Sequence, residues 1–375
     1  MLFHTPLIYA CLITQMGAKS ERKYEIKDAT LRFFHSVLFV AVSQDSLRYA
    51  MGINMNIAVI SYWHVHAEGY TKEVLENTDS KIVAVWDEEE ERGRMYAEEF
   101  SVPFMKDYDE LLHNSDIQGV IITAPTSMHR ELIIKAIKKG KKVFSEKVLA
   151  LTLSACLEIK EALLASGKDI TLSLVKKCES TFLFAKELVD RGSLGRITYA
   201  RMRNVHNGSI GNWLPEHFYN REQCGGGAMI DLGAHPMYLL TWLLGTPLTV
   251  QSVFTDITGH GVEDNAVSVI EFEGGAIGVA ETGFVSVYTP PILEISGTEG
   301  TLIVGETIRY ATKETEGRWI TPEELPCALP SPLVMWARDK WEGNVTFGIE
   351  DSITLTKLME AAYESHATGK KAVIA

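Results

Sequence analysis

Asp231 and His235 form the first pair in the sequence that suggests chemistry, because a carboxylate and an imidazole stand four residues apart. On a helix, residues at this spacing share a face, so the sequence predicts that the two side chains meet. A carboxylate beside an imidazole fixes its tautomer and raises its basicity, which suits removal of a proton from an alcohol. Two alternatives stay open. The pattern is also typical of a plain helix end, and Pro236 can break the helix and separate the two side chains.

Lys147 is the third candidate catalytic residue. It follows Glu146 after the apolar segment Lys142-Val143-Phe144-Ser145, which predicts a strand. A lysine that ends a strand is commonly a solvated charge. Beside a substrate oxygen, however, an ammonium group can stabilise developing negative charge and assist proton transfer.

A polar and aromatic stretch from Asn204 to Glu222 contains the candidate substrate-binding residues His206, Trp213 and His217. Flat aromatic faces suit the C–H groups of a sugar, and polar side chains suit its hydroxyls. The alternative is an irregular loop whose aromatic residues only anchor it to the core.

The elements that must position these residues change character along the chain. From Asn56, short apolar strands at 57–60, 81–87, 119–123 and 142–145 alternate with helices, which predicts a parallel sheet covered on both faces. Longer, alternating strands follow at 197–205, 248–258, 266–272, 276–284, 292–296 and 301–304, as in an antiparallel sheet. The predicted fold class is α/β, a doubly wound Rossmann sheet followed by an α+β domain with a large, mostly antiparallel sheet.

Four segments are expected. Residues 1–54 have no clean period and are interpreted as an upstream N-terminal extension that lacks its own core, and a shorter translation start that omits it is one version of this hypothesis. Residues 55–174 are predicted to form the dinucleotide-binding domain and residues 175–348 the substrate and oligomerisation domain. A final helix, 349–368, begins the segment 349–375 and is expected to pack back on the first domain.

The turn after the first strand, Ser61-Tyr62-Trp63-His64-Val65-His66, lacks the glycines of a dinucleotide fingerprint. Two features still favour a dinucleotide. Ser61 is small enough for a tight turn, and the following helix start offers N–H groups to phosphate. Asp87 ends the second strand, 26 residues after Ser61, where a ribose-binding acid is expected. An acid repels a 2′-phosphate, so NAD is predicted over NADP, although Asp87 can also serve as a helix cap.

Composition excludes several classes of protein. Hydrophobic residues make up 46% of the chain and charged residues 23%, and the formal net charge is −13, which argues against a nucleic-acid partner. The five cysteines are scattered without a Cys-x-x-Cys pair, which is typical of a reducing cytoplasm. No apolar run is long enough to span a membrane, and no metal-ligating cluster is evident in the sequence.

In order and spacing, these motifs resemble the Gfo/Idh/MocA family, the glucose–fructose oxidoreductases, inositol dehydrogenases and related NAD(P)-dependent enzymes. The likeness runs from about Asn56 to near the C-terminus. Its motifs are Ile122-Thr123-Ala124-Pro125-Thr126-Ser127-Met128-His129, Glu146-Lys147, Gly192-Ser193-Leu194-Gly195-Arg196-Ile197, Gly225-Gly226-Gly227 through His235, and Ile295-Ser296-Gly297-Thr298-Glu299-Gly300-Thr301.

The resemblance implies specific roles. Lys147 would lie by the nicotinamide, His235 would be the general base and Asp231 its orienting partner. Glu146 would contact the nicotinamide side, and the cofactor cleft would be lined by Thr123, Pro125 and His129. The chain departs from the family at Val148, where a proline is usual, and at the turn with Trp63 and His64, whose side chains would partly fill the cleft.

The predicted function is hydride transfer between nicotinamide and a secondary alcohol of a sugar, cyclitol or sugar derivative, in a cytoplasmic homodimer or homotetramer formed through the open sheet. Two alternatives remain from the sequence. One is an enzyme that cleaves glycosides with the help of transient oxidation by bound NAD. The other is a ligand sensor that has lost turnover, which the glycine-poor turn favours.

Overall fold

The computed structural model describes residues 55–374. Its first sheet has five parallel strands in the order β2-β1-β3-β4-β5. The strands are β1 (Asn56–Ile60), β2 (Lys81–Trp86), β3 (Gly119–Ile122), β4 (Lys142–Ser145) and β5 (Ile170–Leu172). This is the doubly wound sheet that the alternation of strands and helices predicts.

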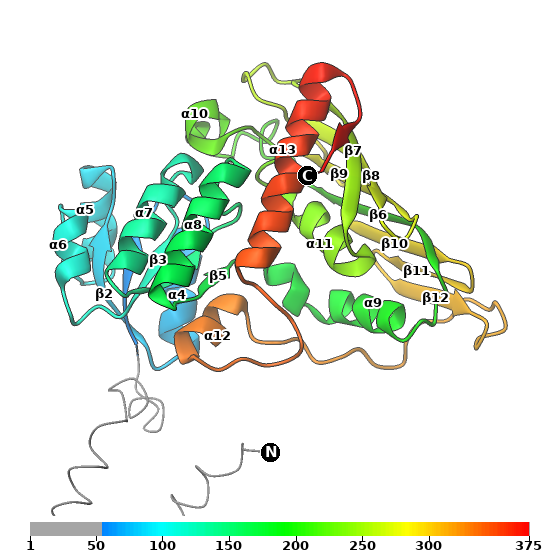
Figure 1. Cartoon of the computed structure of the whole chain (residues 1–375), viewed down its shortest axis with the longest axis horizontal. Coiled ribbons are helices and arrows are strands. Elements are labelled where there is room, and N and C mark those ends of the chain that lie inside the picture. Colours follow the sequence, from blue (N-terminus) through cyan, green and yellow to red (C-terminus); the bar gives the residue numbers. More distant parts are fainter. Residues whose placement is uncertain (1–54, 375) are drawn as a thin grey trace, which may run out of the picture. The chain divides into compact units, whose positions relative to one another are not determined.

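Both faces of the first sheet are buried because successive side chains of a strand point to opposite sides. In β1, Ile57 and Val59 join the core under α4, whereas Ala58 and Ile60 join the core shared with α7 and α8. The helices of this domain are α4 (Ala67–Asn77), α5 (Glu90–Glu99), α6 (Tyr108–His113), α7 (Thr126–Lys138) and α8 (Leu153–Ser166). Figure 1 shows them around the sheet in blue to green.

The second sheet has eight strands in the order β12-β11-β10-β6-β9-β8-β7-β13, and only β6 and β9 pair in parallel. The strands are β6 (Ile197–Val205), β7 (Pro247–Thr255), β8 (Asn265–Phe272), β9 (Ile277–Gly283), β10 (Ile292–Gly297), β11 (Gly300–Val304), β12 (Ile308–Thr312) and β13 (Ala372–Val373). Burial alternates strictly along β8, so one face is covered and the other is open.

Three helices cover the buried face of the second sheet (Figure 1): α9 (Ser180–Asp190), α11 (Ala234–Leu244) and α13 (Ile349–Thr368). The helix α13 coincides with the predicted range 349–368. It packs on α8 and β5 of the first domain and also on α11 and β7 of the second, so it joins the two.

Several short elements are absent from the sequence prediction: β12, β13, α10 (Arg221–Cys224), α12 (Pro332–Arg338) and two 3₁₀ turns, η1 (Val175–Cys178) and η2 (Glu216–Tyr219). Although α12 follows the second sheet in sequence, it packs on α4 and β5 of the first domain. The predicted extension, residues 1–54, lies outside the described residues. Within residues 55–374, no helix combines the length and hydropathy that crossing a bilayer requires.

Candidate active site

The turn between β1 and α4 forms without glycine. Ser61 has φ +75°, a left-handed conformation that usually selects glycine. Its Oγ accepts a hydrogen bond from the Trp63 N–H at 3.0 Å, and its carbonyl accepts one from the Thr123 hydroxyl at 2.6 Å. Ser61 therefore takes the place of the first glycine of the fingerprint, and Thr123 acts by holding this turn.

Asp87 has no free acceptor position for a ribose hydroxyl. Its Oδ2 accepts from the Tyr62 N–H at 2.8 Å and Arg92 Nε at 3.0 Å, and its Oδ1 accepts from the Glu89 N–H at 2.8 Å and Arg92 Nη2 at 2.6 Å. A carboxylate offers about four such positions. In this structure Asp87 ties the turn to the end of β2, and a ribose contact requires Arg92 to move.

Trp63 reaches from the turn to the second domain. Its ring stacks on Phe218 with centroids 5.2 Å apart, and its Nε1 donates to the Gln223 side chain at 3.1 Å. His217 packs against the same indole at 4.9 Å, and its buried Nε2 has no partner within residues 55–374. His217, predicted for the substrate pocket, thus lies beside the dinucleotide turn.

His206 and Trp213 occupy a different part of the predicted stretch. The His206 ring stacks on Phe284 at 4.9 Å and contacts Trp213 at 4.7 Å. Burial lowers the pKa of His206, and the charges that act on it are those of Asp231 and Lys147. His206 is therefore within electrostatic range of Asp231 and Lys147, whereas Trp213 is 52% exposed.

His129 is buried and bridges two carbonyl groups. Its Nε2 lies 3.0 Å from the Ala124 carbonyl and its Nδ1 lies 3.1 Å from the Val148 carbonyl. Pro125 stands directly before α7. His129 thus joins the end of β3 to Val148, the residue that follows the cis Lys147–Val148 peptide bond. The ring holds this segment in place and does not line an open cleft.

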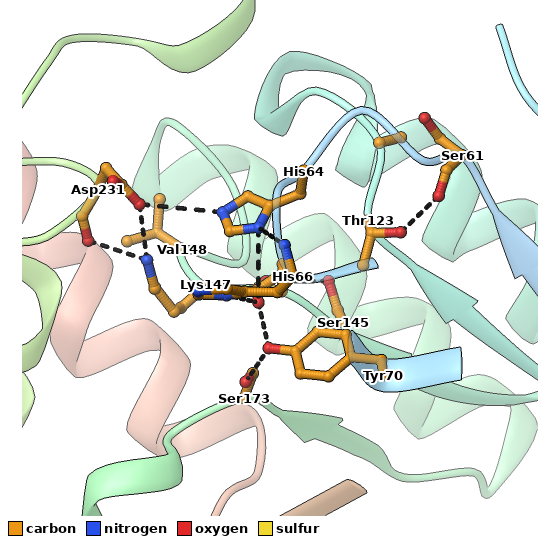
Figure 2. A network of polar contacts seen from close by, with 12 residues as sticks. Ser61, His64, His66, Tyr70, Thr123, Ser145, Lys147, Val148, Ser173 and Asp231 are labelled. Carbon is orange, nitrogen blue, oxygen red and sulfur yellow. Dashed lines mark hydrogen bonds and ion pairs between the residues drawn. The ribbon is translucent and has the colours of Figure 1, made fainter. Parts of the chain in front are cut away.

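Lys147 and Asp231 form one end of the polar network in Figure 2. The Lys147 ammonium donates to Asp231 Oδ1 at 2.8 Å and to the Asp231 carbonyl at 3.0 Å. Burial disfavours the charge on Lys147, yet the carboxylates of Asp231 and Glu146 outweigh it and raise its pKa. Burial likewise disfavours the Asp231 carboxylate, but Lys147 and His64 hold its pKa well below the usual range. The pair is an ion pair at neutral pH.

Glu146 forms the other end of the network. Its Oε1 accepts from the Tyr70 hydroxyl and lies 2.8 Å from His66 Nδ1, and its Oε2 accepts from the Lys147 N–H at 2.8 Å. Burial opposes ionisation, but the neighbouring imidazoles of His64 and His66 and the Lys147 ammonium hold the pKa of Glu146 well below its usual range. Tyr70 and His66 had no signal in the sequence, because nothing there showed that the first turn of α4 faces the end of β4.

The prediction that Asp231 and His235 share a helix face is wrong. The helix α11 begins at Ala234, so Asp231 lies in the preceding turn, where its oxygen meets Lys147. Pro236 causes no kink, since it falls in the first turn, where a proline is tolerated.

His235 instead pairs with Tyr238, whose hydroxyl lies 2.9 Å from Nδ1. That hydroxyl accepts a hydrogen bond from the Lys176 N–H at 3.2 Å, which leaves its own proton for His235 Nδ1. The neutral ring then carries its proton on Nε2. Burial and the Lys147 charge hold the pKa of His235 well below its usual value, so the ring is neutral at pH 7.

The turn that presents Asp231 is held by two residues that the sequence did not indicate. Glu263 Oε1 accepts from the N–H groups of Gly227 and Met229 at 2.9 and 3.0 Å, and it accepts from the Tyr363 hydroxyl at 2.5 Å. A Cβ on Gly227 would lie 2.1 Å from the Glu263 carbonyl oxygen, so glycine is required there.

Comparison with known proteins places the chain in a family. Residues 55–173 match the oxidoreductase family with an NAD-binding Rossmann fold, and residues 182–303 match the GFO/IDH/MocA C-terminal domain. The scyllo-inositol 2-dehydrogenase (NAD(+)) of Bacillus subtilis (strain 168) is 30% identical over 239 residues, 62% of this chain and 68% of that protein. The chain belongs to the Gfo/Idh/MocA family. It is therefore an oxidoreductase with an NAD(P)-binding Rossmann domain, as its motifs predict.

Two further proteins show how far the similarity extends. The 1,5-anhydro-D-fructose reductase of Ensifer adhaerens is 26% identical over 234 residues, 60% of this chain and 68% of that protein. The solved structure of levoglucosan dehydrogenase in complex with NADH superposes with a TM-score of 0.74 at 19% identity, and covers 86% of this chain and 99% of that one. At this identity the superposition shows the fold.

The residues of this Gfo/Idh/MocA chain fit a bound dinucleotide on two observations. Ser61 supplies the left-handed residue of the turn, and the unpartnered, buried Nε2 of His217 is available to a ligand oxygen. Trp63 marks the departure, because the fingerprint has a glycine at this position, which lets the backbone approach the pyrophosphate.

Proposed function

We propose that the protein transfers hydride between NAD and a secondary alcohol or ketone of a sugar, cyclitol or sugar derivative. The observation that carries this proposal is the buried Lys147–Asp231 ion pair at the end of β4, with Nζ 2.8 Å from Oδ1. It lies where the resemblance expects the reactive end of the cofactor. The relatives named for inositol, anhydrofructose and levoglucosan support the substrate class.

The residues proposed to hold the cofactor are Ser61, Trp63, His64, His217 and Glu146, with Asp87 available once Arg92 moves. NAD is proposed over NADP because acidic side chains surround the end of β2. Arg92 is the cation near Ser61, and it is already paired with the three carboxylates of Asp87, Glu88 and Glu89. A 2′-phosphate would meet excess negative charge there.

When bound, nicotinamide supplies or accepts the hydride. The protein's own part is to control the substrate oxygen. Lys147 carries a proton at Nζ and can deliver it to a developing alkoxide, while Asp231 holds the ammonium in place. His235, protonated on Nε2, donates a second hydrogen bond to the same oxygen. In the oxidation direction the steps run in reverse: Lys147 first releases its proton to water, and its neutral amine then accepts the alcohol proton at Nζ as the hydride leaves the carbinol carbon.

This assignment revises the role of His235, which the resemblance implies as general base. A neutral ring whose Nδ1 lone pair accepts from Tyr238 presents a donor to the substrate side. We therefore propose Lys147 as the group that transfers the proton and His235 as the group that polarises the oxygen.

The test is a panel of inositols, anhydrosugars and aldoses scored by nicotinamide absorbance with NAD and NADP, together with NADH titration by fluorescence. Lys147→Met should lower kcat by at least about 100-fold and leave the Kd for NADH within a few-fold, because its role is proton transfer. Lys138→Met, at the far end of α7, is the matched control. Undiminished turnover in Lys147→Met would refute the mechanism, and absence of NADH binding would favour the sensor.

A further inference from the structure

We propose that His64, His66 and Glu146 form a binding site for one divalent transition-metal ion of the zinc type. One donor atom from each of these residues lies within 4.8 Å of the other two. No local pattern in the sequence indicates this site, since a His-x-His pair and a distant glutamate become a cluster only when the β1–α4 turn meets the end of β4. The site shares His64 and Glu146 with the residues proposed to hold the cofactor, so metal binding is tested without the cofactor and does not depend on hydride transfer.

The donor atoms need only small movements to surround a cation. His66 Nδ1 lies 2.8 Å and His64 Nδ1 3.9 Å from Glu146 Oε1. Ligands about 2.0–2.2 Å from a tetrahedral zinc are about 3.4 Å apart. A zinc ion would therefore replace the proton that His66 Nδ1 donates to Glu146 and draw His64 Nδ1 closer. Two imidazoles and one carboxylate are the ligand set of several zinc sites and leave a fourth position open to water or a hydroxyl oxygen.

His64 already presents the correct nitrogen. Its Nδ1 accepts a hydrogen bond from the His66 N–H at 3.2 Å, so this nitrogen carries a lone pair and the ring proton is on Nε2. Nε2 faces Asp231 Oδ1 at 3.9 Å (Figure 2). A carboxylate behind a ligating histidine is the usual arrangement that orients the ring toward a metal. A bound ion would accept the Nδ1 lone pair of His64 in place of the His66 N–H.

The surroundings of Glu146 also suit a ligand. Tyr70 donates to the same oxygen and in turn contacts Ser173 Oγ at 2.5 Å, which fixes the carboxylate. The charges of Glu146 and Asp231 exceed that of Lys147 by one, so a cation adds positive charge where the network is net negative. His66 is 47% exposed and provides an entry path from solvent.

The experiment loads tag-free full-length protein with Zn²⁺, removes the excess and measures bound zinc by mass spectrometry, with affinity from competition against a chromophoric chelator. No cofactor or substrate is present. We expect about one zinc per chain, and His66→Ala should weaken binding at least 10-fold. His113→Ala removes an exposed histidine from the end of α6 and should match the wild type. Because His4 and His35 can bind zinc elsewhere, the difference between these two variants is the decisive value.

Cobalt gives an independent readout, since Co²⁺ in a tetrahedral nitrogen and oxygen site absorbs in the visible range. The band should be present in the wild type and in His113→Ala and lost in His66→Ala. If circular dichroism shows that His66→Ala is unfolded, Glu146→Gln replaces it as the variant that lacks one metal ligand. The proposal is overturned if the wild type retains only traces of zinc, or if the wild type and a folded ligand variant bind it equally.

Discussion

At the scale of single residues, the position of one proton on His235 decides its role. Tyr238 accepts from the Lys176 N–H, and within residues 55–374 its other hydrogen-bond partner is His235 Nδ1, at 2.9 Å. Burial raises the pKa of Tyr238 well above its usual range, so the hydroxyl keeps its proton and can donate it to Nδ1. We propose that the neutral ring therefore carries its proton on Nε2 and polarises a substrate oxygen instead of removing its proton.

The first prediction concerns this hydroxyl. Tyr238→Phe removes the hydroxyl that donates to His235 Nδ1, so the ring proton is no longer kept on Nε2. The substitution should lower kcat roughly 10-fold and reduce the free energy of unfolding by about 1 kcal/mol. Because the pKa of His235 lies well below 6.5, ¹⁵N-histidine spectra of the wild type should show a neutral Nε2–H ring from pH 8 to pH 6. Tyr108→Phe removes another buried tyrosine hydrogen bond, to the Leu132 carbonyl, and should affect stability alone. A His235 signal that titrates near pH 6.5 would contradict the assignment.

At the scale of elements, the helix α13 supports the turn that holds Asp231, the carboxylate that we propose for the active site. The Tyr363 hydroxyl donates to Glu263 and accepts from the Ile230 N–H at 3.2 Å, immediately before Asp231. Tyr363→Phe should therefore lower kcat about 10- to 100-fold through misplacement of Asp231, with KM nearly unchanged. Tyr310→Phe, on β12, is the matched control and should leave both constants unchanged. An equal rise in KM would indicate a general loss of fold instead.

The helices and strands also show which parts of the fold could be predicted from the sequence alone. Long periodic segments were predicted with correct ranges, as at β6 and α13, because hydrophobic periodicity fixes them locally. The helix α12 was missed because the elements that it packs on, α4 and β5, lie far away in sequence. The strand β12 was missed because five residues are too few for a clear period, although its partner β11 is its neighbour in the chain. For the site, Lys147 and Asp231 were predicted as catalytic candidates from their motifs, and that role stays a prediction. Their direct pairing, and the approach of Tyr70 and His66 to Glu146, depend on tertiary contacts that no local pattern contains.

At the scale of the whole molecule, the open face of the second sheet is the surface through which we propose that two copies associate. Strand register aligns Val253, Val267, Glu281 and Arg203 across β7, β8, β9 and β6. Val253 is 67% exposed and Val267 40%, although β-branched residues in strands are usually packed. An apolar strip beside charged groups is typical of a surface that a second protein covers.

The corresponding prediction is that Val253→Glu prevents association. A buried, unpaired carboxylate in each copy should weaken the dimer by at least 10-fold, since desolvation of the charge is not offset by a partner. Light scattering coupled to size-exclusion chromatography should then show the wild type at twice the chain mass or more and the variant at the mass of one chain. Leu164→Glu, at a residue 74% exposed on α8, is the matched control and should keep the wild-type mass. A wild type that elutes as a single chain at micromolar concentration would contradict the proposed association.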